Sequence, residues 1–335
     1  MKGRGCRALT PLSVVHGWGV CFLLLAGVAL GTTSSAAAAA PRTRSSAALP
    51  LEINLAAFEA AKRHVTLSDG VDLAYVQMGD PRGTPVVLIH GYTGSALDWV
   101  PILPYLPRHW RLILPDLRGH GASSKPECCY DLDDFAYDIK LLLDRLRVTR
   151  ADVVGFSLGS VIAQRFVETW PRRTRRVVLI SSTGGWHPCE PPADLHEFDC
   201  GMPEIRALKA APEADSPFMI EWWSSPTPVN EQFIKRERDN AAKLPLRIWR
   251  AVLDQSLTHP DLAAMLPRLT APTLLIWGSE DPIMSPADRA SLEIALPHAA
   301  VRIFAGLGHN QFWEQPRAVA RVINRFLARQ LPGAP

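Results

Sequence analysis

Short apolar runs rich in valine, isoleucine and leucine recur along most of the chain. They have the length of strands and lack the alternation of a sheet with one wet face, so they predict strands that are buried on both faces. These runs lie at residues 84–91, 110–117, 151–157, 175–183, 271–281 and 299–306. The near-alternating stretch 64–79, with Ser-Asp-Gly in its middle, predicts an antiparallel hairpin instead.

Segments with helical spacing separate these strands. Residues 131–148 carry apolar side chains on one side and acidic residues in the first turn, which favours a helix. The apolar side chains are those of Phe135, Ile139, Leu142 and Leu146. Further helices are expected over residues 158–171, 286–296 and 316–330. Strands that alternate with helices predict an α/β fold with a mostly parallel sheet and helices on both of its faces.

The alternation of strands and helices breaks once, over residues 184–268. This segment has no strand pattern and contains helical stretches and several prolines, so we expect a helical insertion between two core strands. Such an insertion would form a lid over the carboxyl edge of the sheet, where open α/β sheets bind ligands. The core is then expected to consist of residues 61–183 and 269–335.

The N-terminus has the features of a signal peptide. It begins with three basic residues, Lys2, Arg4 and Arg7. The apolar stretch 19–30 follows, and residues 34–41 (SSAAAAAP) offer several cleavage sites for a signal peptidase. We therefore predict a signal peptide over residues 1–40 and a flexible leader, outside the fold, over 41–60.

A cleaved signal peptide would export the protein to the periplasm or the medium, with no stable membrane anchor. The alternative is an uncleaved anchor, for which the apolar stretch is shorter than the roughly 20 residues that a spanning helix needs.

The formal net charge is only +3, and the basic start alone supplies it. No basic patch remains that could neutralise phosphates, so we exclude nucleic acid as a partner and expect a small-molecule substrate. The sequence indicates no oligomeric state.

Ser157 lies in the motif GFSLGS (155–160), between a predicted strand and a predicted helix. A serine with glycine two residues before and after it, in that setting, is typical of a nucleophile on a sharp turn. Gly155 and Gly159 would allow the turn to be tight. A serine hydroxyl is a weak nucleophile near neutral pH, so a base and an orienting acid must accompany it.

His309 is the candidate base, because it lies in a glycine-rich loop after the last predicted strand. His120, in RGHG, is the competitor, although its loop is more plausibly architectural. Asp281 is the candidate acid, at the carboxyl end of the strand 271–281, with Glu280 as its alternative. Adjacent residues at a strand end point in different directions, so only one of the two can face the histidine.

The order Ser157, Asp281, His309 resembles that of the α/β-hydrolase fold, in its serine-nucleophile, esterase- and lipase-like branch. The resemblance extends over residues 64–331. It rests on HGYTGSALDW (90–99), DLRGHGASS (116–124), GSEDPIMSP and GLGHN. It implies an oxyanion hole formed by the backbone N–H groups of Tyr92 and Leu158, and it implies neither a cofactor nor a metal.

The expected activity is hydrolysis of carboxylic esters through an acyl-enzyme. Aromatic residues of the insertion suggest an apolar or aromatic substrate, although they would also serve to pack the insertion onto the core. They are Trp186, Phe218, Trp222, Trp223 and Trp249. The alternatives on the same triad are a C–C bond hydrolase, a cofactor-free perhydrolase or haloperoxidase, and an aminopeptidase. A catalytically silent binding protein is the alternative from another class.

Four cysteines follow the predicted signal peptide. Cys189 and Cys200 lie eleven residues apart at the start of the insertion, and export would expose them to oxidising conditions. We therefore predict a Cys189–Cys200 disulfide. Cys128 and Cys129 are adjacent, and a bridge between neighbours is strained, so we expect at least one of them to be unpaired or linked elsewhere.

Overall fold

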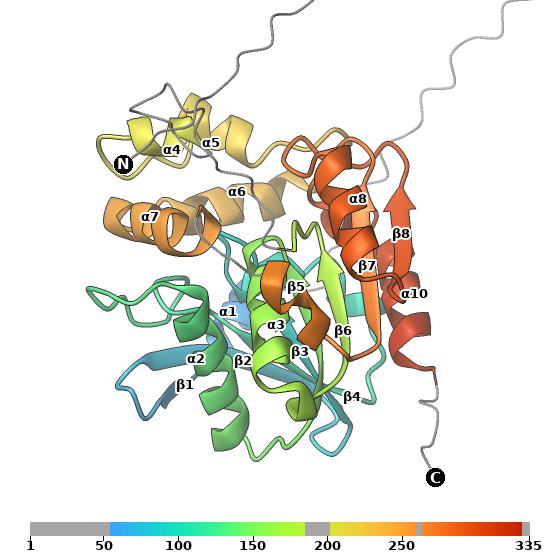
Figure 1. Ribbon diagram of the computed structural model, residues 1–335. Helices are drawn as coiled ribbons and strands as arrows, with labels where there is room; N and C mark the ends of the chain where they lie inside the picture. Colours follow the sequence, from blue (N-terminus) through green and yellow to red (C-terminus); the bar gives the residue numbers. More distant parts are fainter. Residues whose placement is uncertain (1–53, 185–201, 259–262, 330–335) are drawn as a thin grey trace, which may run out of the picture. The chain divides into compact units, whose positions relative to one another are not determined.

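The computed structural model describes residues 54–184, 202–258 and 263–329 (Figure 1). Eight strands form one sheet in these ranges. They are β1 (Arg63–Thr66), β2 (Asp72–Gly79), β3 (Thr84–Ile89), β4 (Trp110–Pro115), β5 (Ala151–Phe156), β6 (Thr174–Ile180), β7 (Thr273–Gly278) and β8 (Ala300–Phe304). Every strand that the apolar runs predict is present.

The strands follow the order β1-β2-β4-β3-β5-β6-β7-β8. β1 and β2 form the predicted antiparallel hairpin, and β2 also pairs antiparallel with β4. The remaining neighbours are parallel. The side chains of β5 and β7 are buried throughout, as expected for central strands covered on both faces. The prediction of a mostly parallel α/β sheet is confirmed.

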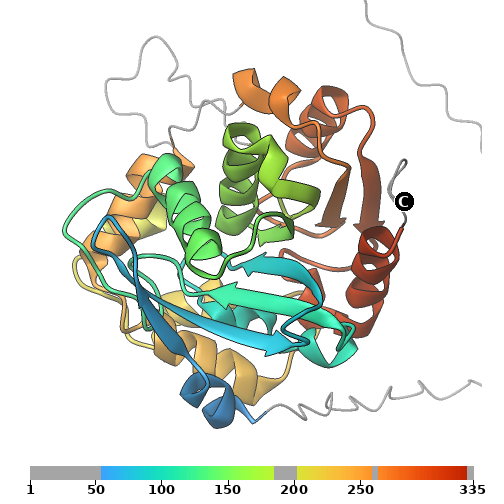
Figure 2. The same ribbon diagram turned by 90° about the horizontal axis from the view of Figure 1, so that it is seen from below.

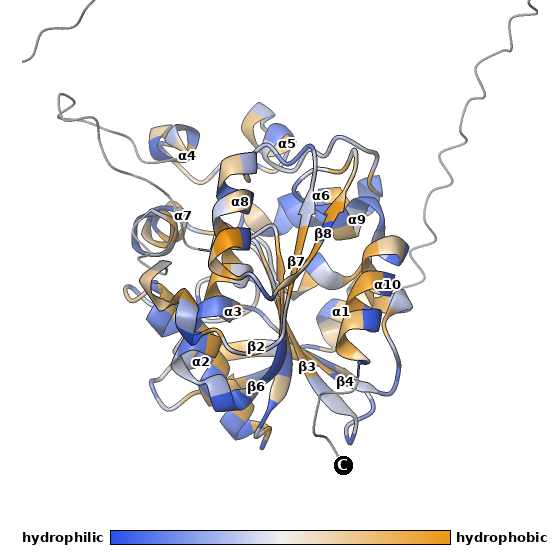
Figure 3. Ribbon diagram, turned by 45° about the vertical axis from the view of Figure 1, so that its right-hand side comes forward, coloured by the Kyte–Doolittle hydropathy of each residue, from blue (hydrophilic) through white to orange (hydrophobic). Residues whose placement is uncertain are grey.

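Helices cover both faces of the sheet. On one face lie α2 (Leu132–Arg145), α3 (Leu158–Thr169) and α8 (Pro286–Ala295); on the other lie α1 (Leu55–Ala60) and α10 (Pro316–Leu327). Figure 3 shows this division, and Figure 2 shows α2 and α3, in green, beside the blue and cyan strands. The apolar side of α2 is buried as predicted, and Asp131 and Asp134 form a capping box at its start.

The first helix, α1, corrects the sequence analysis. Residues 55–60 were expected to belong to a flexible leader, but they form a helix whose N-cap is Asn54 and whose Phe58 is buried in the core. Just after the helix, Lys62 Nζ lies 2.7 Å from an oxygen of the buried Asp116. A helix of about one and a half turns is too short to show a periodic spacing of apolar residues in the sequence. The predicted signal peptide lies outside the described residues.

The described part of the segment between β6 and β7 is helical, as predicted. It contains α4 (Pro203–Ala207), α5 (Pro217–Trp222), α6 (Glu231–Ala241) and α7 (Leu246–Val252), then a π-helical turn (Leu253–Leu257) and a 3₁₀ turn (Ala263–Arg268). Figure 1 shows α4 to α7 gathered at one end of the sheet. Below we call this segment the insertion. Among the described helices, none is both long enough and apolar enough to cross a membrane.

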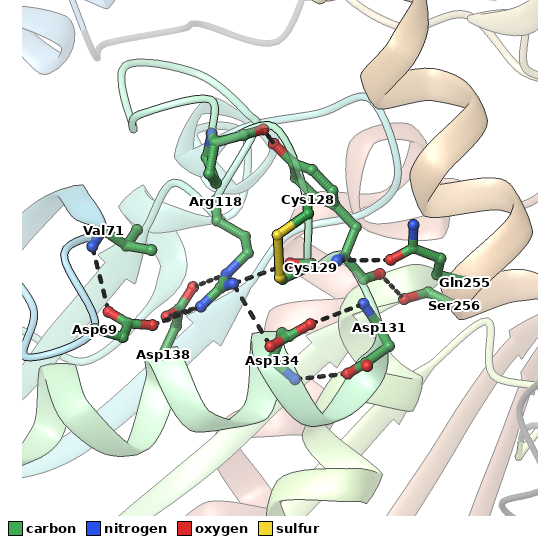
Figure 4. A network of polar contacts seen from close by, with 12 residues as sticks. Asp69, Val71, Arg118, Cys128, Cys129, Asp131, Asp134, Asp138, Gln255 and Ser256 are labelled. Atoms are coloured by element: carbon green, nitrogen blue, oxygen red, sulfur yellow. Dashed lines mark hydrogen bonds and ion pairs between the residues drawn. A yellow bond between two sulfur atoms is a disulfide. The ribbon is translucent and has the colours of Figure 1, made fainter.

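A second correction concerns the cysteines. Cys128 and Cys129 form a disulfide with each other, so the expectation that one of them is unpaired or linked elsewhere is wrong. Cys129 adopts a left-handed backbone conformation, with φ of 76°, and the chain turns sharply there. Figure 4 shows that Arg118 donates to Cys129 O and pairs with Asp138. The predicted Cys189–Cys200 bridge lies outside the described residues.

The loop that contains Cys128, Cys129 and Tyr130 also contacts the insertion. Tyr130 N–H donates to Gln255 Oε1 over 2.9 Å, and Ser256 Oγ donates to Tyr130 O over 2.6 Å (Figure 4). Both partners belong to the π-helical turn after α7. The loop therefore connects the Arg118 ion-pair cluster of the core to the end of the insertion.

Candidate active site

Ser157 lies in a sharp turn between β5 and α3. Its φ of 51° and ψ of −119° fall in a region that non-glycine residues rarely adopt. Its backbone N–H donates to Ile180 O over 2.9 Å, which ties the turn to the neighbouring strand β6. Backbone strain of this kind persists where the surroundings fix it, and it is frequent at functional positions.

Two glycines make room for this turn. A Cβ atom on Gly155 would lie 2.1 Å from Gly159 O, and one on Gly159 would lie 2.2 Å from Ile89 O. Backbone atoms cannot move aside as a flexible side chain can. Glycine at both positions is therefore what allows α3 to approach the strands so closely, as the sequence predicts.

His309 is paired with Asp281 and not with Glu280. Its Nδ1 lies 2.9 Å and 3.0 Å from the two carboxylate oxygens of Asp281. Asp281 is buried, and its Oδ1 also accepts hydrogen bonds from the N–H groups of Ile283 and Met284. Glu280 is exposed and accepts a hydrogen bond from the neighbouring Ser279 hydroxyl. Of the two adjacent carboxylates, only Asp281 orients the imidazole.

The surroundings of Asp281 keep its carboxylate charged. Burial on its own would raise its pKa, but the charge and hydrogen bond of His309 and the two backbone N–H groups together hold the pKa below its ordinary value of 3.8. Because Nδ1 faces this carboxylate, Nε2 is the ring nitrogen of His309 that is left for proton exchange on the other side of the ring.

The loop that carries His309 is fixed by residues that the sequence analysis did not identify. Ser181 Oγ donates to His309 O over 2.8 Å, and Gln311 Nε2 donates to Ser181 Oγ over 2.8 Å. Gly308 N–H donates to Glu314 Oε1 over 2.8 Å. Glu314 also accepts a hydrogen bond from the Thr227 hydroxyl of the insertion. Gly308 lies in the motif GLGHN, but the side chains that hold the loop, those of Ser181, Gln311 and Glu314, belong to no recognisable motif, because only the fold brings them close to it.

Tyr92 and Leu158, the expected donors of an oxyanion hole, both line the cavity that Ser157 lines. Leu158 is the first residue of α3, so its N–H has no acceptor within the helix and lies at the positive end of the helix dipole. The loop of Tyr92 is held by Asp98, whose Oδ2 accepts the Gly91 N–H over 3.0 Å. Asp98 is a further residue that the sequence analysis missed.

Two buried acids lie beneath this loop. Burial raises the pKa of Asp98 to about 8, although the N–H groups of Gly91 and Ser95 oppose the shift. Glu237, on α6, is fully buried, and burial, together with the nearby charge of Asp98, raises its pKa well above 4.5. Neither carboxylate oxygen of Glu237 has a hydrogen-bond partner among the described residues. Both groups therefore tend to stay protonated.

The cavity beside Ser157 has a volume of about 1080 Å³. His309 lines it together with three of the predicted aromatic residues, Phe218, Trp222 and Trp223. The Trp222 indole donates to the Thr93 hydroxyl over 2.9 Å, and its ring packs edge-on against Tyr92. Core and insertion thus contribute to one cavity, with the serine and the histidine in its wall.

The remaining candidates are placed elsewhere. His120 is fully buried beside His90 and is not part of the cavity wall, so its role is architectural, as the sequence suggests. Trp249 is buried and packs behind Tyr92 and Trp222. Trp186, Cys189 and Cys200 lie outside the described residues. Among the residues that the structure describes, no cluster of His, Cys, Asp or Glu is arranged to hold a metal ion.

Comparison with known proteins agrees with this geometry. Residues 84–316 match the family defined by the alpha/beta hydrolase fold. A non-heme chloroperoxidase from Streptomyces lividans is 30% identical over 76% of this chain and 95% of its own. Lipase 3 from a Moraxella species is 24% identical over 79% and 84% of the two chains.

Solved structures give the same assignment. The crystal structure of a protein assigned as an aryl esterase from Burkholderia cenocepacia matches with a TM-score of 0.66 and 25% identity. The match covers 79% of this chain and 97% of the other. The parallel sheet, the helical insertion between β6 and β7 and the matched sequence region all agree, and the chain belongs to the alpha/beta hydrolase fold family.

Proposed function

We propose that the protein hydrolyses carboxylic esters through an acyl-enzyme formed on Ser157. The observation that carries the proposal is that His309, paired with the buried Asp281, lines the same cavity as Ser157 in its strained turn. A nucleophile, a base and an orienting acid in this chain order fit acyl transfer. The esterase and lipase among the similar proteins support the same reaction class.

In the first half of the proposed reaction, Ser157 Oγ attacks the ester carbonyl while His309 Nε2 takes its proton. Asp281 stabilises the imidazolium that forms. The N–H groups of Tyr92 and Leu158 donate to the negative oxygen of the tetrahedral intermediate, a contribution of about 3 kcal/mol each by comparison with other oxyanion holes. The carbon–oxygen bond of the ester then breaks, and the departing alcohol receives the proton from His309.

In the second half, water attacks the acyl-enzyme, and His309 takes a proton from it. The new tetrahedral intermediate collapses, the bond to Ser157 Oγ breaks, and the serine recovers its proton from His309. The aromatic side chains Phe218, Trp222 and Trp223 favour an apolar or aromatic substrate. In this mechanism the insertion acts as the lid of the substrate cavity.

A second candidate activity follows from the chloroperoxidase relative. If hydrogen peroxide replaced water in the second half, the acyl-enzyme would yield a peracid instead of an acid, with the same residues in the same roles. Parallel assays of ester loss, acid formation and peracid formation in the presence of peroxide separate the two. C–C bond hydrolysis and aminopeptidase activity are tested in the same way with diketone and aminoacyl amide substrates.

Covalent labelling and burst kinetics test the acyl-enzyme directly. p-Nitrophenyl esters with acyl chains from C2 to C16 should give a burst of p-nitrophenol, and an organophosphonate should label Ser157, as read by peptide mapping. Ser157→Ala should abolish both while the protein stays folded. A folded Ser157→Ala protein that retains most of the activity would exclude this mechanism. Absence of any turnover or label in the wild-type protein would favour a silent binding protein.

We also infer that the protein is exported through residues 1–40. The support is the basic start, the apolar stretch and the alanine-rich cleavage region of the sequence. Sequencing the N-terminus of the protein recovered outside the cytoplasm should find a start near the alanine-rich region. A protein that keeps Met1 and stays with the membrane would identify an uncleaved anchor instead.

A further inference from the structure

The side chains that charge the wall of the cavity beside Ser157 are acidic in the described part of the chain. Among the described residues in its wall there is no lysine or arginine, and His309 is the one histidine. Besides the buried Asp98, four carboxylates line it from four different elements: Glu204 of α4, Glu221 of α5, Glu280 of the loop after β7, and Asp288 of α8. A charged group that enters the cavity therefore meets negative charge from both the insertion and the core.

Within residues 54–184, 202–258 and 263–329, these four carboxylates have no cationic partner. Asp288 accepts hydrogen bonds from Ser285 in a capping box, and Glu280 accepts one from Ser279, but both partners are neutral. Glu204 and Glu221 are exposed and form no ion pair with any described residue. Their charge is therefore not neutralised locally. Clefts with apolar walls and charge of one sign focus the electric field on what enters them.

The apolar part of the wall presents aromatic rings. Phe218 and Trp222 stack with ring centroids 5.9 Å apart, and Tyr92 meets Trp222 edge-on at 5.9 Å. Glu221 directly precedes Trp222 on α5. Aromatic faces attract cations, and an aromatic face beside a carboxylate is a common way to hold an ammonium group. The charges and the rings favour the same kind of ligand.

Two buried polar atoms in the same wall have no partner within the described residues. They are Asp98 Oδ1 and Trp223 Nε1, and the two residues are only 1% and 5% exposed. Both atoms have almost no exposed surface, so they lie behind the lining of the cavity and do not contact what enters it.

We propose that this cavity selects esters that carry an ammonium group or no charge, and discriminates against esters that carry an anionic group. The inference rests on the proposed ester hydrolysis and names its substrate class. An anionic acyl group would face four carboxylates without a cation to balance it, whereas an ammonium group would lie against aromatic rings and carboxylates together.

Three p-nitrophenyl esters with acyl chains of equal length test the proposal. Their acyl chains end in trimethylammonium, in tert-butyl or in carboxylate. At low ionic strength, kcat/KM should be at least about tenfold higher for the cationic ester than for the anionic one, with the neutral ester between them or level with the cation. Because exposed charges are screened, about 0.5 M salt should narrow the gap. Equal rates for the three esters, or a preference for the anion, would overturn the proposal.

Charge-removing variants locate the effect. Glu204→Gln, Glu221→Gln and Glu280→Gln combined should reduce the preference for the cationic ester several-fold. The matched control combines Glu213→Gln, Glu231→Gln and Glu293→Gln, which remove the same charge from residues outside the cavity wall, and should leave the preference unchanged. A preference of the same size in the first variant and the wild type would overturn the assignment to these residues.

A binding experiment separates this inference from the proposed function. Calorimetric titration of Ser157→Ala protein with hexyltrimethylammonium and with heptanoate needs no turnover. The cation should bind at least about tenfold more tightly. Tighter cation binding without hydrolysis of any ester by the wild type would support the cavity preference and overturn the esterase proposal. Equal binding, or tighter binding of heptanoate, would overturn the cavity preference whatever the esters show.

Discussion

Asp281 and Glu280 are neighbours in sequence but have different surroundings. Asp281 is buried against His309, whereas Glu280 is exposed. Asp281→Asn should favour the wrong imidazole tautomer and lower kcat by about 10³- to 10⁴-fold, as in other triads. Glu280→Gln should stay within a few-fold of the wild type on a neutral ester. Steady-state kinetics of the two variants decide, and the reverse ranking would mean that Asp281 is not the orienting acid.

Substitution of Gly155 tests whether the turn at Ser157 depends on the close approach of Gly155 to the backbone of Gly159. The Cβ atom of Gly155→Ala would collide with Gly159 O, so either α3 or β5 must shift. We expect a loss of about 2 kcal/mol or more in the free energy of unfolding. The control is Gly306→Ala, where the added Cβ would meet open space. Because Gly306 has a φ of 73°, alanine should still lower the free energy of unfolding by about 1 kcal/mol. Denaturant unfolding measures both, and an equal cost would count against the close-packing explanation.

The buried acids Asp98 and Glu237 make stability depend on pH. The native state keeps these protons at pH values where the unfolded chain has lost them, because both pKa values are raised. Stability should therefore fall as pH rises above the ordinary pKa range of carboxyl groups, with the contribution of Asp98 lost by about pH 8. Asp281 acts in the opposite direction and only near its lowered pKa, as the solution becomes more acidic.

Asp98→Asn and Glu237→Gln together should flatten this dependence. The amide oxygen of Asn can still accept the Gly91 N–H, so the loop of Tyr92 should keep its conformation. Free energies of unfolding at pH 5, 6, 7 and 8 give the slopes of the variant and the wild type. Because the two acids are close enough to titrate together, the double variant is the informative one. Equal slopes would mean that other groups control the pH dependence.

At the scale of elements, Tyr92 links the core to helix α7. Its hydroxyl donates to Trp249 O, and its ring packs against Trp222 and Trp249. Tyr92→Phe removes the hydrogen bond and keeps the rings, so the insertion should be held less firmly, by about 1 kcal/mol. Limited proteolysis within residues 202–258 should become several-fold faster. Tyr137→Phe, at a 40% exposed tyrosine of α2, is the control. Equal proteolysis of the two variants would count against this link.

The elements themselves were predictable where many residues share one pattern. The apolar runs at 84–91 and 151–157 predict central strands because burial on both faces excludes polar residues from them. α1 was not predictable, because six residues give too little periodicity and its anchor, Phe58, is apolar like many residues of flexible segments. The prediction that Cys128 and Cys129 are not bridged to each other was wrong. The left-handed turn at Cys129 is fixed by contacts of the fold and not by the local sequence, so the sequence alone does not reveal it.

At the scale of the whole molecule, the candidate nucleophile, base and acid were predictable because each follows a strand at the same sheet edge. The residues that hold their loops were not. Ser181 and Glu314 have ordinary local sequences, and their partners lie in the loop of His309 and in the insertion. Asp98 lies in the motif HGYTGSALDW, but the motif does not reveal that its carboxylate accepts the Gly91 N–H. Such positions are defined by which segments meet in space, and a single sequence does not contain that information directly.

The insertion leaves the sheet after β6 and returns at β7, and these two strands are direct neighbours. The two strands are parallel, with Val177 opposite Thr273 and Ile180 opposite Ile276, so the insertion begins at the carboxyl end of β6 and the chain crosses back to the amino end of β7. A crossover connection takes no part in the strand pairing, so it can change length and sequence during evolution without altering the register of the two strands. Its aromatic and acidic side chains line the cavity, while Ser157, His309 and Asp281 belong to the core. Substrate preference can therefore diverge among descendants of this protein while the reaction chemistry is inherited intact.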